Sequence, residues 1–278
     1  MRSATRAAVL GSPIAHSLSP VLHNAGYAAL GLTERHYGRF EVDEAGLPGF
    51  LAALDVAGEG WAGLSLTMPL KRVVIPLLDQ VSETALAVDA VNTVVFDEDG
   101  RRTGDNTDVP GLVAALRERG VTEVESASVL GAGATASSTL AALGRVCSGE
   151  VTAYVRGAER AAQMLALGER LQVKVRTADW GRAAEAFDAP LTVSTTPAGA
   201  ADHLAAAVPH SPGVLFDVLY HPWPTALAAA WSRRGGSVLG GLDLLVHQAV
   251  LQFEMFTGAA PAPLAEMRAA GEAALGGL

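Results

Sequence analysis

Lys71 is the residue whose type points most directly to chemistry in this sequence. The chain contains only two lysines, Lys71 and Lys174, against eighteen arginines. An ammonium group can give up and recover a proton when its surroundings favour it, whereas a guanidinium group stays charged under ordinary conditions. A lysine kept in so arginine-rich a composition is therefore a candidate for proton transfer. The alternative is a solvated lysine, since Lys71 follows the strand-like run 64–70 and its proline.

A glycine-rich turn at 131–136 has the spacing of a nucleotide-binding loop. It reads G-A-G-A-T-A, follows the apolar run 127–130 and opens an alanine-rich helical segment. Glycine at 131 permits a tight turn, Gly133 lets the main chain approach a pyrophosphate, and small Ala136 allows the helix to pack against the strand. The candidate cofactor residues are Gly131, Ala132, Gly133, Ala134, Thr135 and Ala136. A simple tight turn in a glycine-rich chain is the alternative.

Two arginines follow the next predicted strand, 151–155. Arg156 comes directly after this strand, and Arg160 lies one helical turn later. A carboxylate here would bind the hydroxyls of the adenine ribose and repel a 2′-phosphate, whereas guanidinium groups attract that phosphate. The pattern favours NADP over NAD. Two solvated arginines at the start of a helix are the alternative.

Short strands and helices must position the residues of the first part of the chain. Strands are predicted at 7–10, 61–67 and 91–96. Pro20 opens a helical pattern, and the segment 97–100 has the composition of a hairpin turn. A helix is predicted between Pro110 and Gly120, where we expect a change of domain.

A regular alternation of strands and helices begins at Ser126. Strands are predicted at 127–130, 151–155, 173–175, 191–194 and 214–218. Such alternation is typical of a parallel sheet flanked by helices. Lys174 alternates with apolar residues and is expected to face outward from its strand, with no function. A last helix is predicted at 242–256.

Composition restricts the classes of function. The chain has 278 residues, room for two domains, and its net charge is −9 with a pI near 5.2. This charge disfavours binding to nucleic acid or to anionic membranes. The single cysteine, Cys147, excludes an internal disulfide, and no stretch reaches the roughly 18 apolar residues of a membrane span. No signal peptide is recognised, so we expect a cytoplasmic protein.

Several motifs, in one order, carry a resemblance to a known family. They are GSPIAHSLSP at 11–20, T-M-P-L-K at 67–71, A-V-N-T at 90–93, GDNTD at 104–108, GAGATA at 131–136, D-V-L-Y at 217–220, and Gly241-Leu242 leading to Gln248. With this set the chain resembles the shikimate dehydrogenase family over nearly its whole length.

The resemblance implies reversible hydride transfer between NADPH and the C3 carbonyl of 3-dehydroshikimate, which makes shikimate on the way to chorismate and the aromatic amino acids. Lys71 would donate the proton in reduction and accept it in oxidation. Asp108 would hold the lysine head and a ring hydroxyl. Because Asp108 precedes Val109-Pro110, it is also suited to cap a helix, and both roles can coexist.

The resemblance also implies a fold and a set of substrate contacts. We expect two α/β domains, 1–108 completed by 242–278 for substrate and catalysis, and a Rossmann-like NADP-binding domain at 109–241, with the active site in the cleft between them. The implied contacts are Ser17, Ser19 and Tyr220 for the carboxylate, Thr67, Asn92 and Gln248 for the ring hydroxyls, Ser65 beside them, and Gly241 on the cofactor side.

Each substrate contact has a structural alternative. Ser17 and Ser19 are suited to cap the following helix. Asn92 and Gln248 could instead be polar groups satisfied inside the fold.

Three departures from the family pattern bear on specificity. Ser65 stands where asparagine is common, which affects substrate choice. The frequent N-R-T segment reads Val155-Arg156-Gly157 and the N-A-T-S segment reads S-T-T-P at 194–197, which affects cofactor fit.

Other readings remain open. Quinate or an amino-substituted shikimate is an alternative substrate, and a non-catalytic NADP-binding sensor is an alternative class. Methylenetetrahydrofolate dehydrogenase is a more distant alternative whose motifs are not matched. His16 and His23 lie seven residues apart without a completing ligand, so no metal is predicted. The expected assembly is a monomer or a homodimer.

Overall fold

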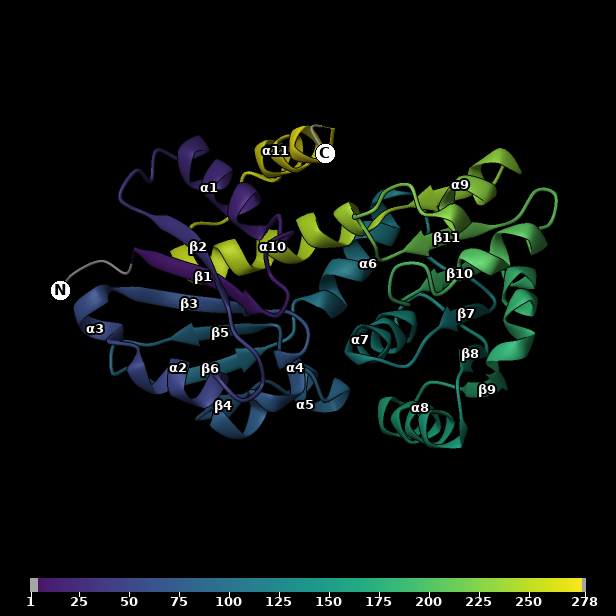
Figure 1. The fold of residues 1–278 in the computed structure, drawn as a ribbon, viewed down its shortest axis with the longest axis horizontal. Helices are drawn as coiled ribbons and strands as arrows, with labels where there is room; N and C mark the ends of the chain where they lie inside the picture. The colour runs from purple at the N-terminus through teal and green to yellow at the C-terminus, as the bar shows by residue number, and fades with distance from the viewer. Residues whose placement is uncertain (1–4, 277–278) are drawn as a thin grey trace. The chain divides into compact units, whose positions relative to one another are not determined.

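Two six-stranded sheets organise the computed structural model, which describes residues 5–276 (Figure 1). The chain divides into two units, each built around one sheet. The first unit contains the described residues up to Thr107 and from Leu245 onward, and the second runs from Asp108 to Leu244. The predicted α/β fold class is confirmed.

The first sheet is mixed, with strand order β2-β1-β3-β5-β6-β4. Its strands are β1 Arg6–Gly11, β2 His36–Glu41, β3 Trp61–Leu66, β4 Gln80–Val81, β5 Thr93–Phe96 and β6 Arg102–Asp105. β1 pairs in parallel with β2 and β3, whereas β5 runs antiparallel to β3 and β6. The predicted hairpin turn joins β5 to β6, where the Asp97 carboxylate accepts the main-chain N–H groups of Asp99 and Arg101 at 3.0 and 2.8 Å.

Helices cover both faces of the first sheet (Figure 1). They are α1 Ser19–Ala29, α2 Leu47–Ala53, α3 Val56–Glu59, α4 Leu70–Val73, α5 Glu83–Val88, most of α10 Gly241–Thr257, and α11 Leu264–Gly276, with a 3₁₀ turn η1 at Ile75–Leu77. On one face α1 packs closely on α10 and α11, because a Cβ at Gly26 would lie only 2.8 Å from the Phe253 ring and 3.2 Å from Met267 Cγ. On the other face Leu47 of α2 and Leu70 of α4 join the apolar core.

The second sheet is wholly parallel, with order β12-β11-β10-β7-β8-β9. Its strands are β7 Ala127–Leu130, β8 Val151–Val155, β9 Val175–Asp179, β10 Leu191–Ser194, β11 Val214–Asp217 and β12 Ser237–Leu239. Numbered within the unit, this is the 3-2-1-4-5-6 order of dinucleotide-binding domains, whose ligand site lies where the order reverses, here between β7 and β10.

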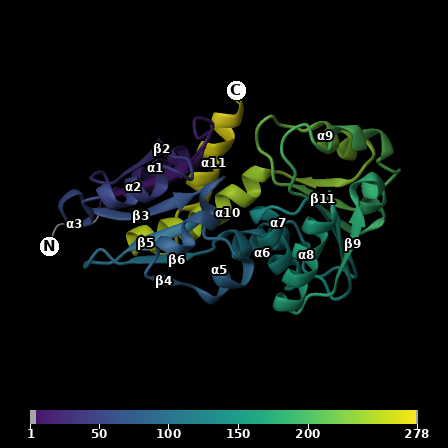
Figure 2. The same cartoon turned by 60° about the horizontal axis from the view of Figure 1, so that its bottom comes forward.

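Helices also flank the second sheet. They are α6 Asp108–Glu118, α7 Ala134–Leu143, α8 Ala158–Leu171 and α9 Ala226–Arg233, with 3₁₀ segments η2 at Trp180–Asp188 and η3 at Asp202–Ala207. α7 lies beside α6 and α8 (Figure 2), and η2, η3 and α9 enclose a core that contains Phe187 and Trp231.

One strand prediction needs correction. The strand expected at 173–175 begins only at Val175, so Lys174 precedes the strand instead of alternating within it. The reason is local: α8 ends in a left-handed residue, Gln172 with φ +57°, and the chain must recover before pairing with β8. Among the described residues no helix is both long and apolar enough to cross a lipid bilayer.

Candidate active site

Loops from three strands of the first unit meet at one edge of its sheet. The Thr67 N–H donates to the Leu10 carbonyl at 2.9 Å, which ties the end of β3 to the end of β1. The Leu66 N–H donates to the Asn92 carbonyl at 2.8 Å, which ties it to the start of β5. These ties bring together the segments that carry the predicted residues Ser17, Ser19, Thr67, Lys71 and Asn92. The carboxyl ends of parallel strands are where α/β folds place ligands.

Lys71 is the second residue of α4 and is half-buried. Its carbonyl accepts the N–H of Val91 at 2.7 Å, so the turn that carries it is anchored to the segment before β5. This setting differs from that of Lys174, which is exposed. Lys71 belongs to the first unit and Asp108 to the second, and their pairing remains a prediction. Asp108 is buried and is the first residue of α6, where its charge suits the positive end of the helix dipole.

Asn92 lies in a buried network with Thr107 and Gln248, and only 2% of its surface is exposed. Its side-chain oxygen accepts the Thr107 N–H and the Thr93 hydroxyl, each at 2.8 Å. Its amide nitrogen donates to Thr107 Oγ1 at 2.9 Å and to Gln248 Oε1 at 3.4 Å. Internal bonding is therefore present, as the structural alternative supposed, and it fixes which way the amide of Asn92 points.

Ser17 and Ser19 stand at the entrance to α1. The helix begins at Ser19 and has no side-chain cap. Ser17 Oγ accepts the Ser19 N–H only at 3.4 Å, a long bond, so capping makes little use of these two hydroxyls.

Ser65 is buried and bonded on two sides. Its hydroxyl is 2.6 Å from the Tyr37 hydroxyl and 2.7 Å from Gln252 Oε1. Burial raises the pKa of Tyr37 far above its ordinary range, so this phenol stays protonated. Tyr37 belongs to none of the sequence motifs, and sequence reasoning missed it.

The glycine turn of the second unit fits a dinucleotide pyrophosphate. Gly131 has φ +112°, and a Cβ there would lie 2.6 Å from Thr195 Oγ1, so glycine is needed for both conformation and space. A Cβ at Gly133 would meet no atom of the described structure within 4 Å, which leaves room for a ligand against the main chain. α7 begins at Ala134 with no side-chain cap, and the N–H groups at the start of a helix are suited to bind an anion.

Arg156 and Arg160 are both exposed beyond β8. The Arg156 guanidinium carbon lies 5.1 Å from the centroid of the Trp180 ring, a cation–π contact that restrains it. Arg160 donates to Gln163 Oε1 at 2.9 Å. The sequence did not predict Trp180 as a partner of Arg156, because Trp180 follows β9, the next strand along the chain.

Tyr220 is half-buried in the loop after β11, which Asp217 organises. The Asp217 carboxylate accepts the Thr225 hydroxyl at 2.7 Å and the Leu219 N–H at 3.3 Å. Burial raises the pKa of Asp217. Gly241 has a packing role here, since a Cβ would collide with the main chain of Val218.

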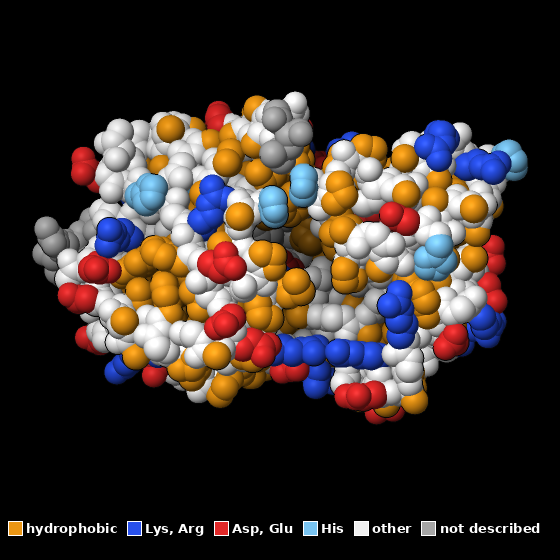
Figure 3. All heavy atoms as spheres, in the orientation of Figure 1, with side chains coloured by type: hydrophobic (Ala, Val, Ile, Leu, Met, Phe, Trp, Pro, Cys, Tyr) orange, Lys and Arg blue, Asp and Glu red, His pale blue; other side chains and the backbone are white. Residues whose placement is uncertain are grey.

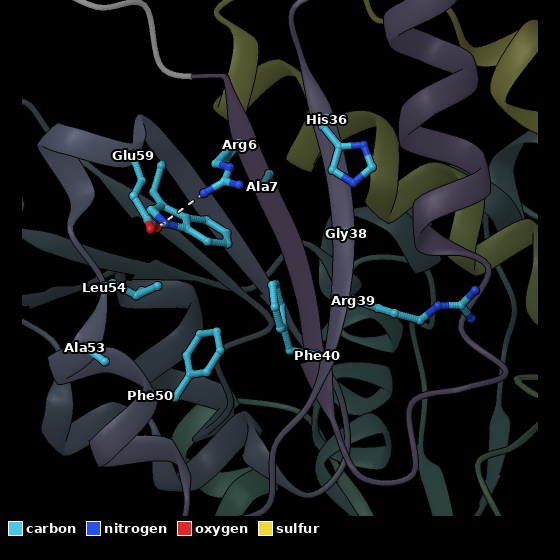
Figure 4. Close-up of a pocket in the computed structure, with 11 residues that line it drawn as sticks. Arg6, Ala7, His36, Gly38, Arg39, Phe40, Phe50, Ala53, Leu54 and Glu59 are labelled. Carbon is cyan, nitrogen blue, oxygen red and sulfur yellow. Dashed lines mark hydrogen bonds and ion pairs between the residues drawn. The ribbon is translucent and has the colours of Figure 1, made fainter.

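A hollow of about 600 Å³ on the first unit lies apart from all these residues. Arg6, Phe40, Phe50 and Trp61 line it (Figure 4), and none of the predicted site residues does. Its polar lining residues are Arg6, His36, Arg39 and Glu59, which belong to none of the predicted motifs, so we place the candidate site by the loops and not by this cavity.

Three further properties of the described residues bear on the sequence expectations: metal binding, the surroundings of His23 and the distribution of surface charge. No three His, Cys, Asp or Glu side chains among them gather in a way that could hold a metal ion. His23 is buried against Tyr37, with ring centroids 4.0 Å apart. Basic and acidic side chains are interspersed on the face shown in Figure 3.

Comparison with known proteins places this geometry in a family. The profile of the shikimate dehydrogenase substrate binding domain matches residues 9–94, and that of the shikimate 5'-dehydrogenase C-terminal domain matches residues 241–270. Shikimate dehydrogenase (NADP(+)) of Oleidesulfovibrio alaskensis is 39% identical over 94% of this chain and 92% of its own length.

Solved structures agree with the sequence comparison. Mycobacterium tuberculosis shikimate dehydrogenase is 40% identical with a TM-score of 0.86, covering 97% of this chain and 99% of that one. The Thermus thermophilus enzyme, solved in complex with NADP(H) and shikimate, is 34% identical with a TM-score of 0.84, again covering 97% and 99%. The chain, with its substrate-binding domain and Rossmann-like domain, therefore belongs to the shikimate dehydrogenase family.

Proposed function

We propose that this protein catalyses the reversible, NADP-dependent interconversion of shikimate and 3-dehydroshikimate. The observation that carries the proposal is that main-chain hydrogen bonds hold together the segments of the first unit that carry the predicted hydroxyl, amide and ammonium groups, in a family whose relatives are named for this reaction. Bound NADPH supplies the hydride for reduction of the C3 carbonyl.

Lys71 is the proposed proton donor. Hydride addition to a ketone leaves negative charge on its oxygen, and a positioned acid that neutralises this charge typically accelerates such a step by about 10²- to 10⁴-fold. Asp108 is proposed to orient the lysine ammonium and a ring hydroxyl through charge-assisted hydrogen bonds. In oxidation the same lysine receives the hydroxyl proton.

The other predicted residues bind and orient. Ser17 and Ser19, with Tyr220, are proposed to hold the carboxylate through hydroxyl groups. Thr67, Asn92 and Gln248 are proposed to hold the ring hydroxyls, because neutral groups that can donate and accept suit a diol. On the cofactor side the turn 131–136 is assigned to the pyrophosphate, Gly241 to the cofactor in general, and Arg156 with Arg160 to the 2′-phosphate.

A direct assay tests the proposal. Purified protein is mixed with shikimate and NADP, and NADPH formation is followed by its near-ultraviolet absorbance, with quinate and NAD as comparison substrates. Rapid, NADP-preferring turnover of shikimate is expected. Absence of any absorbance change over hours would favour a binding protein without catalysis, and preference for quinate with NAD would reassign the substrate.

The working form is proposed to be a monomer or homodimer in the cytoplasm. Light scattering of the purified protein, with and without NADP, measures the assembly directly. A larger oligomer would contradict this part of the proposal.

A further inference from the structure

A buried chain of hydrogen bonds in the first unit includes two of the predicted substrate contacts, Ser65 and Asn92. Its members, here called the Tyr37 chain, are Tyr37, Ser65, Gln252, Thr93 and Asn92. Each is at most 4% exposed. Because buried polar groups are held to their partners, the direction in which protons are donated along this chain is a fixed property of the site.

The direction of donation along the Tyr37 chain is set by the main-chain carbonyl of Asn92, which can only accept a hydrogen bond. Gln252 Nε2 lies 3.1 Å from the carbonyl oxygen of Asn92 and 2.9 Å from the Thr93 hydroxyl. The amide nitrogen must face that carbonyl, so the amide oxygen of Gln252 faces Ser65. A second main-chain group supports the same orientation. The Thr107 N–H fixes the side-chain oxygen of Asn92 at 2.8 Å, and the Thr93 hydroxyl donates to that oxygen. Thr93 is then left to accept from Gln252 Nε2.

The hydroxyl proton of Ser65 is therefore held in a hydrogen bond to Gln252. Ser65 donates to Gln252 Oε1 at 2.7 Å, and its remaining contact, at 2.6 Å, requires the Tyr37 hydroxyl to donate to it. One lone pair of Ser65 takes the tyrosine proton and one lone pair is left. A ligand that reaches Ser65 meets an acceptor and no donor.

We propose that Ser65 selects substrates by polarity: the ring substituent that faces it must donate a hydrogen bond, so a hydroxyl or an amine is accepted there and a group without a proton is rejected. Gln252 enforces this selection by holding the serine proton. Tyr37 supports it by occupying the second lone pair. The inference rests on the proposed function and on the expectation from the sequence that Ser65 lies beside the residues that contact the ring hydroxyls.

Substrate analogues measure the selection. Two fluoro analogues of shikimate are used, in which one or the other non-reacting ring hydroxyl is replaced by fluorine, which accepts weakly and cannot donate. The readout is kcat/KM for shikimate divided by kcat/KM for each analogue. Wild-type protein is expected to favour shikimate by about 10-fold or more for one of the two, the value of roughly one hydrogen bond. The matching amino analogue is expected to remain a substrate.

Two variants are expected to lower that ratio and a third to keep it. Gln252→Leu releases the serine proton, so Ser65 can donate and the ratio falls towards one. Ser65→Ala removes the contact, and the ratio falls as well. Tyr37→Phe leaves the serine proton on Gln252, so the ratio is kept while KM for shikimate rises a few-fold.

Tyr27→Phe is the matched control, because Tyr27 is a second buried tyrosine of the same aromatic cluster and contacts the Phe253 ring. Its ratio and KM are expected to stay at wild-type values. Thermal unfolding of every variant separates loss of fold from loss of selection, and Ser65→Ala and Tyr37→Phe keep the test decisive if Gln252→Leu does not fold.

The outcomes distinguish failure of the proposed function from failure of the proposed role of Ser65. If wild-type protein does not turn over shikimate, the proposed function fails. If it does, but Ser65→Ala leaves both ratios unchanged, or Tyr37→Phe lowers the ratio as far as Gln252→Leu does, the proposed polarity of Ser65 is overturned.

Discussion

The two units hold their candidate ligand-binding groups in different ways. In the first unit, amide and hydroxyl side chains are held in a buried network, with Asn92 2% and Gln252 1% exposed. In the second, the candidate contacts are a main-chain turn at Gly131 to Gly133 and an exposed guanidinium on Arg156. A buried network fixes the polarity of each atom before a ligand arrives, whereas backbone amides and exposed charges recognise phosphate with fewer constraints on side chains. Substitutions should therefore act differently in the two units.

The largest effect is expected from Lys71→Ala. Removal of the proposed proton donor should lower kcat by about 10²- to 10⁴-fold with little change in KM for shikimate. Steady-state rates in both directions measure it. Lys174→Ala is the matched control and should behave as wild type. Turnover at the wild-type level in Lys71→Ala would remove the lysine from the mechanism.

Arg156→Ala should act on the cofactor alone. Loss of a charge-assisted contact to a 2′-phosphate should raise KM for NADP on the order of 10-fold and leave KM for NAD unchanged. Arg170→Ala, at the far end of α8, is the control. An equal rise for both cofactors would show that the arginine does not read the phosphate.

A pair of glycine substitutions separates conformation from ligand space. Gly131→Ala should destabilise the fold by about 1–2 kcal/mol, because φ is +112° there and Thr195 fills the space. Gly133→Ala should leave the melting temperature unchanged and weaken NADP binding severalfold, since only a ligand would meet the new methyl group. Calorimetric unfolding and titration with NADP measure the two effects. Unchanged NADP affinity in Gly133→Ala would argue against close approach of the cofactor at this glycine.

The last effect appears only in acid, is nearly absent at neutral pH, and concerns stability. Burial lowers the pKa of His23 from 6.5 to about 3, so its neutral form is the folded form. The stabilisation is fully present above about pH 6.5 and is lost as pH falls towards 3, by about 1.4 kcal/mol for each pH unit. Urea unfolding at several pH values measures this slope.

His23→Phe should flatten that part of the curve, while His36→Asn, at an exposed position on β2, should not. A steep acid slope that persists in His23→Phe would assign the effect to other groups.

Position within a sheet decided which strands could be predicted. The inner strands β7, β8 and β10 have the expected bounds because both faces are buried, so the sequence shows a continuous apolar run. The edge strands β2, β4 and β12 were not predicted, and β9, also an edge, was displaced; the inner strand β6 was implied only by the predicted hairpin turn before it. An edge strand is half solvated, and its pattern is too weak to recognise.

The same reasoning explains which site residues could be found. Lys71, Asn92 and the glycine turn stand in short motifs whose residue types have a chemical reason. Tyr37 and Gln252 have none, since their contacts to Ser65 span 28 and 187 residues of sequence. No local pattern encodes a bond between segments so far apart.

The sequence alone determined the α/β class, the family and the candidate chemistry, because glycine spacing, apolar runs and a rare lysine are local properties of the chain. Only the tertiary structure determined the direction of the buried hydrogen bonds. It placed the Asn92 carbonyl against Gln252, and that contact directs the proton of Ser65 away from any ligand. Hydrogen-bond direction depends on which acceptor lies nearest in space, and that is set by the packing of α10 against β3 and β5.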